Sequence, residues 1–147
     1  TDFDLYYDEL GKPHLRDGKK ISITHSYTFS AIIVSDQEVG IDIEMQRSKI
    51  LKIAQKFTPL EEYRTLANED ALIRKLTMVW GAKESLYKSF AEAGVSFLQN
   101  IYVEDFDMES MKTTANVSYK GKNEDYYVWF EEFEGFTGAY ALISEKE

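Results

Sequence analysis

The chain of 147 residues contains no cysteine, only two prolines, and no apolar run near the ~20 residues that a membrane helix needs. The absence of cysteine excludes disulfides, thiolate metal ligands and cysteine nucleophiles. It also fits a cytoplasmic location, as does the absence of a recognisable signal peptide. Glycine and proline are too few for a disordered or collagen-like chain. These absences indicate one globular domain that has no membrane partner.

Positive charge is scarce, because 17 Lys and Arg residues stand against 26 Asp and Glu residues and the net charge is −9. A nucleic-acid partner is therefore not expected, since phosphate backbones are bound by basic surfaces. The acidity is uneven along the chain. Residues 104–147 carry a net charge of −7 and residues 1–103 only −2. The first two-thirds of the chain can therefore present a basic face to an anionic ligand or partner.

The apolar pattern predicts strands at both ends of the chain and helices between them. Runs rich in β-branched and aromatic residues predict the strands, and turn residues separate them. Residues 9–20 are expected to form a turn-rich loop. The expected strands cover residues 2–8, 21–26, 29–34, 39–44, 101–106, 113–119, 126–133 and 136–143. This order predicts an α+β fold in which a mainly antiparallel sheet packs on a long helix.

Three helical segments are expected in the middle of the chain. The first covers residues 50–57, where apolar side chains recur at helical spacing. The second begins at Thr58, which offers a hydroxyl N-cap before a proline and two glutamates. The third and longest runs from Ala71 to about Glu92, and Gly94 is expected to end it.

Two carboxylates stand two residues apart in the expected strand 39–44. Asp42 and Glu44 point to the same face because side chains alternate along a strand, whereas Ile41 and Ile43 point to the other face. Adjacent carboxylates repel each other unless a cation neutralises them. Mg²⁺ is suited to this role because it binds carboxylate and phosphate oxygens. The alternative is a strand with a solvated acidic face, which is common in antiparallel sheets.

The segment 80–88, with the sequence WGAKESLYK, places further charges on the longest helix. Glu84 and Lys88 lie four residues apart and share one face. Lys83 lies about 100° away around the helix axis. The alternative is an exposed ion pair that stabilises the helix by only a few tenths of a kcal/mol. Trp80 is expected in the core rather than at a binding site.

Basic and hydroxyl side chains gather in two segments near the start of the chain. Lys12 lies in a Gly-Lys-Pro turn, which would fix its position, and Thr24 and His25 end a short apolar strand. Lysine, histidine and hydroxyl groups can bind phosphate oxygens. The alternative is that the histidine has a structural role at the strand end. The sequence has no glycine-rich phosphate loop, no GxSxG elbow and no metal-ligand spacing of its histidines.

Together these motifs resemble the 4′-phosphopantetheinyl transferase superfamily, of the holo-acyl-carrier-protein synthase type. The sequences GKP, ITHS, VGIDIE, KFTPLEEY and WGAKESLYK occur in the order that is typical of its larger, pseudo-dimeric branch. They span residues 11–88, and a weaker similarity continues through residues 135–144. One motif alone is modestly specific, whereas all five in order are highly specific. The resemblance predicts a single domain over residues 1–147, with the first half of the larger-branch pattern shortened because only 38 residues precede VGIDIE.

The resemblance implies transfer of the phosphopantetheine arm of coenzyme A to a serine of an acyl or peptidyl carrier protein, with release of adenosine 3′,5′-bisphosphate. It implies Mg²⁺ as the cofactor, with Asp42, Glu44 and Glu84 at the metal. Glu84 is implied as the general base for the serine, and Asp42 and Lys88 as the other catalytic residues. Lys88 is also expected to contact the pyrophosphate. The remaining coenzyme A contacts are expected at Lys12, Thr24, His25 and Lys83.

Two other functions stay open at this point. One is a non-catalytic or truncated relative that binds coenzyme A or a carrier protein without turnover, and the other is a Mg²⁺-dependent phosphohydrolase. An acidic carrier protein is expected to dock on the basic segment 47–75. Self-association is also expected, because a shortened first half would leave strand edges or apolar surface to cover.

Overall fold

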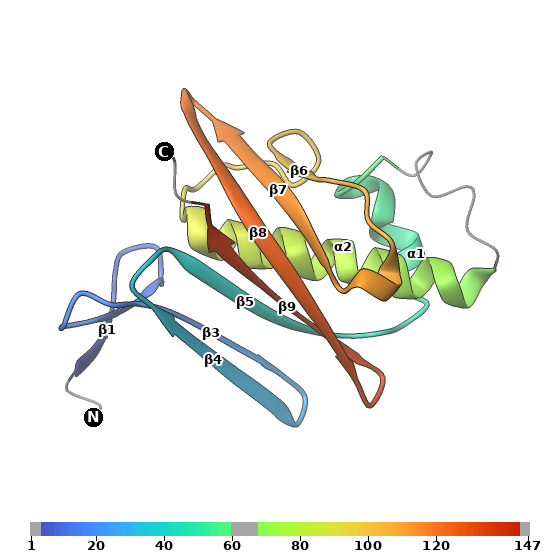
Figure 1. Ribbon diagram of the computed structural model, residues 1–147, viewed down its shortest axis with the longest axis horizontal. Coiled ribbons are helices and arrows are strands. Elements are labelled where there is room, and N and C mark those ends of the chain that lie inside the picture. Colours follow the sequence, from blue (N-terminus) through green and yellow to red (C-terminus); the bar gives the residue numbers. More distant parts are fainter. Residues whose placement is uncertain (1–3, 60–67, 145–147) are drawn as a thin grey trace.

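The computed structural model describes residues 4–59 and 68–144. Strands form both ends of the described chain and helices lie between them, as Figure 1 shows. The predicted helix that begins at Thr58 falls largely on residues 60–67, outside the described residues. In chain order the elements are β1 (Leu5–Tyr7), β2 (Pro13–Leu15), β3 (Lys20–Ser26), β4 (Phe29–Ser35), β5 (Val39–Met45), α1 (Ile50–Ile53), η2 (Ala54–Lys56), α2 (Glu69–Phe90), β6 (Ile101–Val103), η4 (Met108–Ser110), β7 (Lys112–Tyr119), β8 (Lys122–Phe133) and β9 (Phe136–Ile143).

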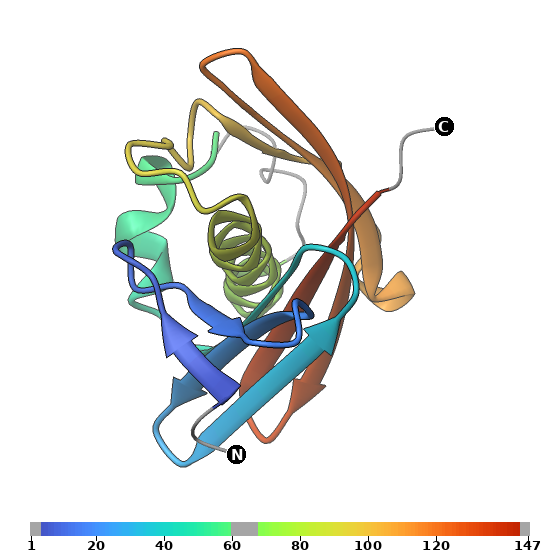
Figure 2. The same ribbon diagram turned by 90° about the vertical axis from the view of Figure 1, so that its left-hand side faces the viewer.

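Five strands form one antiparallel sheet in the order β5-β9-β8-β7-β6, and α2 packs along one of its faces. In Figure 2 the helix is seen end-on, with the sheet on one side of it and α1 on the other. The predicted α+β fold, with a mainly antiparallel sheet packed on a long helix, is confirmed. The core is the contact between these two layers, and it is built from Leu76, Val79, Ala82, Leu86, Val117, Val128, Phe130, Ala139 and Ala141.

Helix α2 begins and ends at signals that are local in the sequence. The Asn68 side chain accepts a hydrogen bond from the amide of Ala71 at 2.8 Å, so it caps the helix. The negative charges of Glu69 and Asp70 in the first turn interact favourably with the helix dipole. The helix ends at Ala91, whose φ of 56° is left-handed. The expected stop at Gly94 is therefore wrong, because the backbone turns three residues earlier.

A hairpin of β3 and β4 forms a separate two-stranded sheet that packs on the free edge of β5. The amide of Ile41 donates to Ser22 Oγ at 3.0 Å, and the amide of Ile43 donates to Thr24 Oγ1 at 3.3 Å. Side-chain hydroxyls thus satisfy edge amides that another strand would otherwise bind. These bonds hold the hairpin beside the carboxylate-bearing strand.

The segment 9–20 is not wholly a loop, as was expected, because Pro13–Leu15 forms β2 and pairs with β1. This small sheet contacts β3 and lies near the C-terminal end of α2. Within residues 4–59 and 68–144, no helix combines the length and the apolarity that are needed to cross a membrane.

Strand β5 approaches α2 so closely that Gly40 has no room for a side chain. A Cβ atom at this position would overlap the backbone carbonyl of Ser85. Backbone cannot yield as a flexible side chain can, so the strand or the helix would have to move.

We expect Gly40→Ala to lower the free energy of unfolding by about 3 kcal/mol, because the overlap forces β5 away from α2. Gly138→Ala in β9 is the matched control, since a Cβ there would meet its nearest atom, on the Phe133 ring, at an ordinary 3.4 Å. Urea unfolding of both variants measures the difference. Equal stabilities would contradict the close approach.

Candidate functional site

Three carboxylates lie near one another where β5 packs on α2. Asp42 and Glu44 extend from the face of β5 that is turned toward the helix, and Glu84 extends from the helix. Asp42 is buried, whereas Glu44 and Glu84 are half-buried. The packing places Asp42 beside Glu44, as predicted, and brings both within electrostatic range of Glu84.

The surroundings oppose ionisation of Asp42. Burial is the main cause that raises its pKa to about 9; the charge of Glu44 and its hydrogen bond come next, and Glu84 adds a further contribution, while the charge of Lys88 acts in the opposite direction. The pKa of Glu84 is raised mainly by burial and further by Glu44, again against Lys88. The cluster therefore has an excess of negative charge in a partly desolvated place.

Lys88 is the cation inside this cluster. Its Nζ donates to the carbonyl oxygen of Ile41 at 2.8 Å and to Asp42 Oδ1 at 3.3 Å. The side chain is 30% exposed, so part of the ammonium group faces solvent. The Glu84 and Lys88 pair is therefore not merely an exposed surface ion pair, because Lys88 ties the helix to β5 beside Asp42.

The donor set fits a divalent cation by its chemistry. Asp42 Oδ2 is buried and has no hydrogen-bond partner among the described residues. An unsatisfied carboxylate oxygen near two further carboxylates is a hard oxygen environment of the kind that Mg²⁺ binds. In the described ranges, however, no three Asp, Glu or His side chains are gathered closely enough to enclose an ion as they stand. The fit thus rests on the orphaned oxygen and on the charge excess.

Thr24 joins the cluster and His25 does not. The Thr24 hydroxyl is buried, accepts from the amide of Ile43 and donates to Asp42 Oδ1 at 3.5 Å. His25 is exposed on the opposite face of β3, because neighbouring side chains on a strand alternate. The structure therefore separates two residues that were expected to act together on a phosphate.

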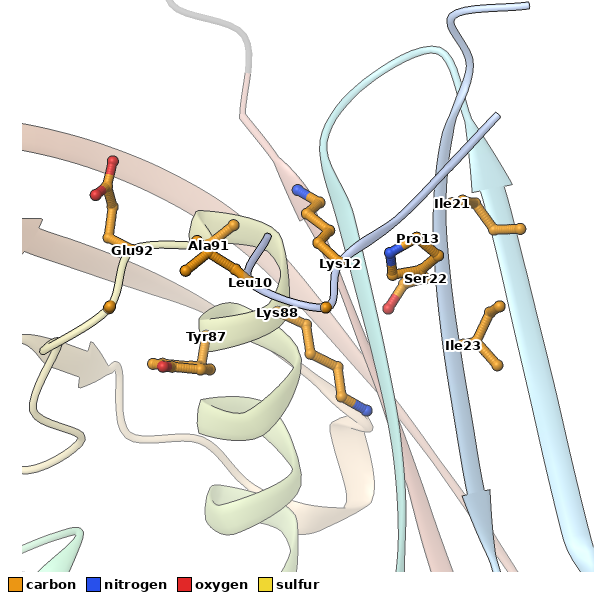
Figure 3. Close-up of a pocket in the computed structure, with 12 residues that line it drawn as sticks. Leu10, Lys12, Pro13, Ile21, Ser22, Ile23, Tyr87, Lys88, Ala91 and Glu92 are labelled. Atoms are coloured by element: carbon orange, nitrogen blue, oxygen red, sulfur yellow. The ribbon is translucent and has the colours of Figure 1, made fainter. Parts of the chain in front are cut away.

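Lys12 lies at a cleft of about 220 Å³ between the β1–β2 hairpin, β3 and the C-terminal end of α2. In Figure 3 the stems of Lys12 and Lys88 both border the cleft, and their ammonium groups point to opposite ends of it. Lys12 Nζ donates to Glu38 Oε2 at 2.9 Å and to the carbonyl oxygen of Ser89 at 3.2 Å. The sequence analysis did not identify Glu38 as part of this site, because its ion-pair partners, Lys12 and Lys20, are distant from it in the chain.

Lys83 lies in the protein interior, away from the cleft. It is 3% exposed, and its Nζ donates to the carbonyl oxygens of Phe57 at 2.6 Å and Phe97 at 2.7 Å. The Trp80 ring packs against the rings of these same two phenylalanines and so against the core, as predicted, but it is only partly buried. This placement argues against the expected contact of Lys83 with coenzyme A, because the ammonium group already joins two loops to α2.

The basic segment 47–75 divides into exposed and structural cations. A cavity of about 260 Å³ beside Glu44 is bordered by exposed Arg47 and Lys49. Arg74 instead binds Glu132 through Nε at 2.7 and 2.8 Å, and Lys75 is buried against Asp105 and the Phe106 carbonyl. Arg74 and Lys75 therefore do not belong to the expected docking surface, and Arg64 lies outside the described residues.

Comparison with known proteins gives two concordant results. A family model described as the 4′-phosphopantetheinyl transferase superfamily matches residues 38–142. The chain is also 26% identical over 132 residues to a curated protein of Aneurinibacillus migulanus named 4′-phosphopantetheinyl transferase gsp, and the match covers 88% of this chain. It covers 54% of that relative, so the chain spans about half of the relative's length.

We expect Lys83→Met to lower the free energy of unfolding by about 2 to 4 kcal/mol, because it leaves two loop carbonyls without their charged donor. Lys52→Met, at an exposed position of α1, is the control and should change stability by less than about 0.5 kcal/mol. Thermal and urea unfolding measure both variants. A Lys83→Met protein as stable as the wild type would argue against the structural role.

The raised pKa of Asp42 predicts how stability depends on pH. Between the ordinary value of 3.8 and about 9, the folded protein retains a proton that the unfolded chain releases, so this group lowers stability as pH rises through that window. We expect Asp42→Asn to stabilise the metal-free protein by about 1–3 kcal/mol at pH 8 and to have little effect near pH 3. Urea unfolding in a chelator at both pH values tests this. A variant that is destabilised at pH 8 would contradict the assigned direction.

Proposed function

The chain belongs to the 4′-phosphopantetheinyl transferase superfamily, and on this premise we propose that it transfers the phosphopantetheine arm of coenzyme A to a serine of an acyl or peptidyl carrier protein. The observation that carries the proposal is the partly buried cluster of Asp42, Glu44 and Glu84 with Lys88 inside it. In this reaction the serine oxygen forms a bond to the phosphorus that bears the pantetheine. The bond from that phosphorus to the bridging oxygen breaks, and adenosine 3′,5′-bisphosphate leaves.

Asp42, Glu44 and Glu84 would hold Mg²⁺ in this proposal. The orphaned Oδ2 atom of Asp42 and the mutual repulsion of the carboxylates support that assignment. A bound Mg²⁺ would supply charge neutralisation and polarisation of the pyrophosphate. Of the three, Asp42 is the most buried and has its position fixed by β5, so it would define where the cation lies.

Glu84 would accept the proton of the carrier serine, directly or through a water molecule. Burial raises its pKa above the ordinary value for glutamate, which makes its carboxylate a better proton acceptor near neutral pH. Lys88 would offset the negative charge that develops on the leaving bisphosphate. Its ammonium group donates to Asp42 and to the carbonyl oxygen of Ile41 and is partly exposed to solvent, which supports this role.

The nucleotide part of coenzyme A would occupy the cleft between the β1–β2 hairpin and the end of α2. Lys12 borders one end of this cleft and Lys88 the other, and Ile21 and Ile23 add apolar surface. Thr24 would contact a phosphate of coenzyme A from the side on which Asp42, Glu44 and Glu84 lie. A contact from His25 would be limited to parts of the ligand that extend over the exposed face of β3.

The carrier protein would dock across α1 and the neighbouring part of α2. Exposed lysine and arginine side chains surround an apolar floor formed by Ile53 and Trp80, next to Glu44. This arrangement suits an acidic partner with an apolar contact at its centre. The exposed cations are Arg47, Lys49, Lys52 and Lys56.

Self-association is a separate part of the proposal. Among the described residues, β4 pairs with β3 and with no other strand, and Ile32 and Val34 on its outer face are 62% and 49% exposed. A second copy of the chain would cover these side chains. Light scattering of the purified protein measures this property independently of its activity.

The activity is tested by intact-mass spectrometry of apo carrier proteins incubated with the chain, Mg²⁺ and coenzyme A. We expect one carrier class to gain the mass of a single phosphopantetheine arm, and Glu84→Gln to lower the rate at least about 100-fold with unchanged stability. Wild-type turnover in Glu84→Gln would remove Glu84 as the base.

Other outcomes of the same experiment identify the alternatives. A folded protein that binds coenzyme A and modifies no carrier would support a non-catalytic relative. Release of adenosine 3′,5′-bisphosphate without any carrier would support a phosphohydrolase. Either result would overturn the proposed transfer.

A further inference from the structure

Glu38 lies between two lysines at the edge of the cleft. Its Oε2 accepts from Lys12 Nζ at 2.9 Å, and its Oε1 is 3.2 Å from Lys20 Nζ. Lys12 belongs to the loop between β1 and β2, and Lys20 begins β3, so one carboxylate joins two elements through two cations. Glu38 precedes the VGIDIE segment and belongs to none of the five sequence motifs.

The backbone of Glu38 is anchored to the main sheet. Its carbonyl oxygen accepts from the amide of Ile143 at 3.0 Å, and the next residue, Val39, is 1% exposed. Burial of the carboxyl group raises its pKa, but the hydrogen bonds and charges of Lys12 and Lys20 outweigh this effect and hold the pKa below its ordinary value. The Glu38 carboxylate therefore stays ionised, its two lysine partners hold it in place, and its backbone is fixed at the start of β5.

Lys12 continues this link across the cleft. One wall of the cleft is the loop from Leu10 to Pro13, and the opposite wall is the last turn of α2 with the residues that follow it, from Tyr87 to Ala93. The Lys12 ammonium group donates to Glu38 and to the carbonyl oxygen of Ser89 at the helix end. A positive charge at this end of a helix also interacts favourably with the helix dipole. These two bonds use two of its three donors and fix the distance between the walls.

We propose that Glu38 is a positioning residue of the nucleotide cleft. It holds Lys12 and Lys20, and thereby keeps the loop wall at a fixed position relative to the end of α2. This inference rests on the proposed function for the identity of the ligand, coenzyme A. It assigns no direct ligand contact to Glu38. Its effect would reach the nucleotide through the placement of Lys12.

A positioning role and a purely electrostatic role predict opposite signs. Glu38 has the same charge as the phosphates of coenzyme A, so removal of that charge alone would strengthen binding. Removal of the link would instead weaken binding, because the cleft wall and the Lys12 ammonium group would no longer be held in place. The direction of the change in affinity therefore separates the two roles.

Glu38→Gln should raise the KM for coenzyme A and the Kd for adenosine 3′,5′-bisphosphate roughly tenfold, with kcat within about twofold of the wild type. Glu92→Gln is the matched control. Glu92 is exposed on the opposite wall of the same cleft, and its nearest ion-pair contact is 3.9 Å from Lys122 Nζ. The same loss of charge there should lower the Kd, by less than about threefold.

A double-variant cycle and hydrogen exchange complete the test. If Glu38 acts through Lys12, then Lys12→Met combined with Glu38→Gln binds the bisphosphate no more weakly than Lys12→Met alone. The amides of residues 9–12 should also exchange faster in Glu38→Gln without any ligand, while those of α2 keep their wild-type rates. Uniformly faster exchange would show loss of fold rather than loss of position, and Glu38→Asp, which keeps the charge, then replaces Glu38→Gln in the same measurements.

Three results would overturn the inference: a Kd that falls or stays unchanged in Glu38→Gln, additive effects in the double variant, or unchanged exchange at residues 9–12. Calorimetric binding of the bisphosphate and hydrogen exchange need neither a carrier protein nor turnover. Failure of carrier modification with these results intact would therefore overturn the proposed function and leave the role of Glu38 standing.

Discussion

The close packing of β5 on α2 is the constraint on which the rest of the site depends. Gly40 allows the strand to approach the helix backbone, and Ala139 and Ala141 on the neighbouring strand keep the interface thin. At this distance Asp42 comes within reach of Lys88. A larger side chain at Gly40 would separate the strand from the helix and, with it, the carboxylates of one element from those of the other.

This packing conflicts with the chemistry of the residues that it gathers. Carboxylates repel one another, and burial deprives Asp42 of the water that would stabilise its charge. Lys88 and the Thr24 hydroxyl offset only part of this cost, because Oδ2 of Asp42 stays without a partner among the described residues. Sites that hold unfavourable charge in this way are commonly functional, since a cation or ligand relieves the strain when it binds.

The sequence predicts those parts of the site that depend on one element at a time. Alternation along a strand places Asp42 beside Glu44, and helical spacing places Glu84 beside Lys88, so both pairs follow from residue spacing alone. The sheet and the long helix were equally predictable from their apolar patterns. The end of that helix was not, because a left-handed alanine took the place of the glycine that usually marks such a stop.

Long-range pairing is what the sequence could not reveal. Lys83 stands in the same motif as Glu84, yet its side chain turns inward to two loop carbonyls, and only the packed structure distinguishes the two roles. The same holds for Arg74 and Lys75, whose acidic partners lie 58 and 30 residues away in the chain. A cation in a motif therefore has to be assigned from its acceptors, because the charge alone is equally suited to binding a ligand and to holding the fold together.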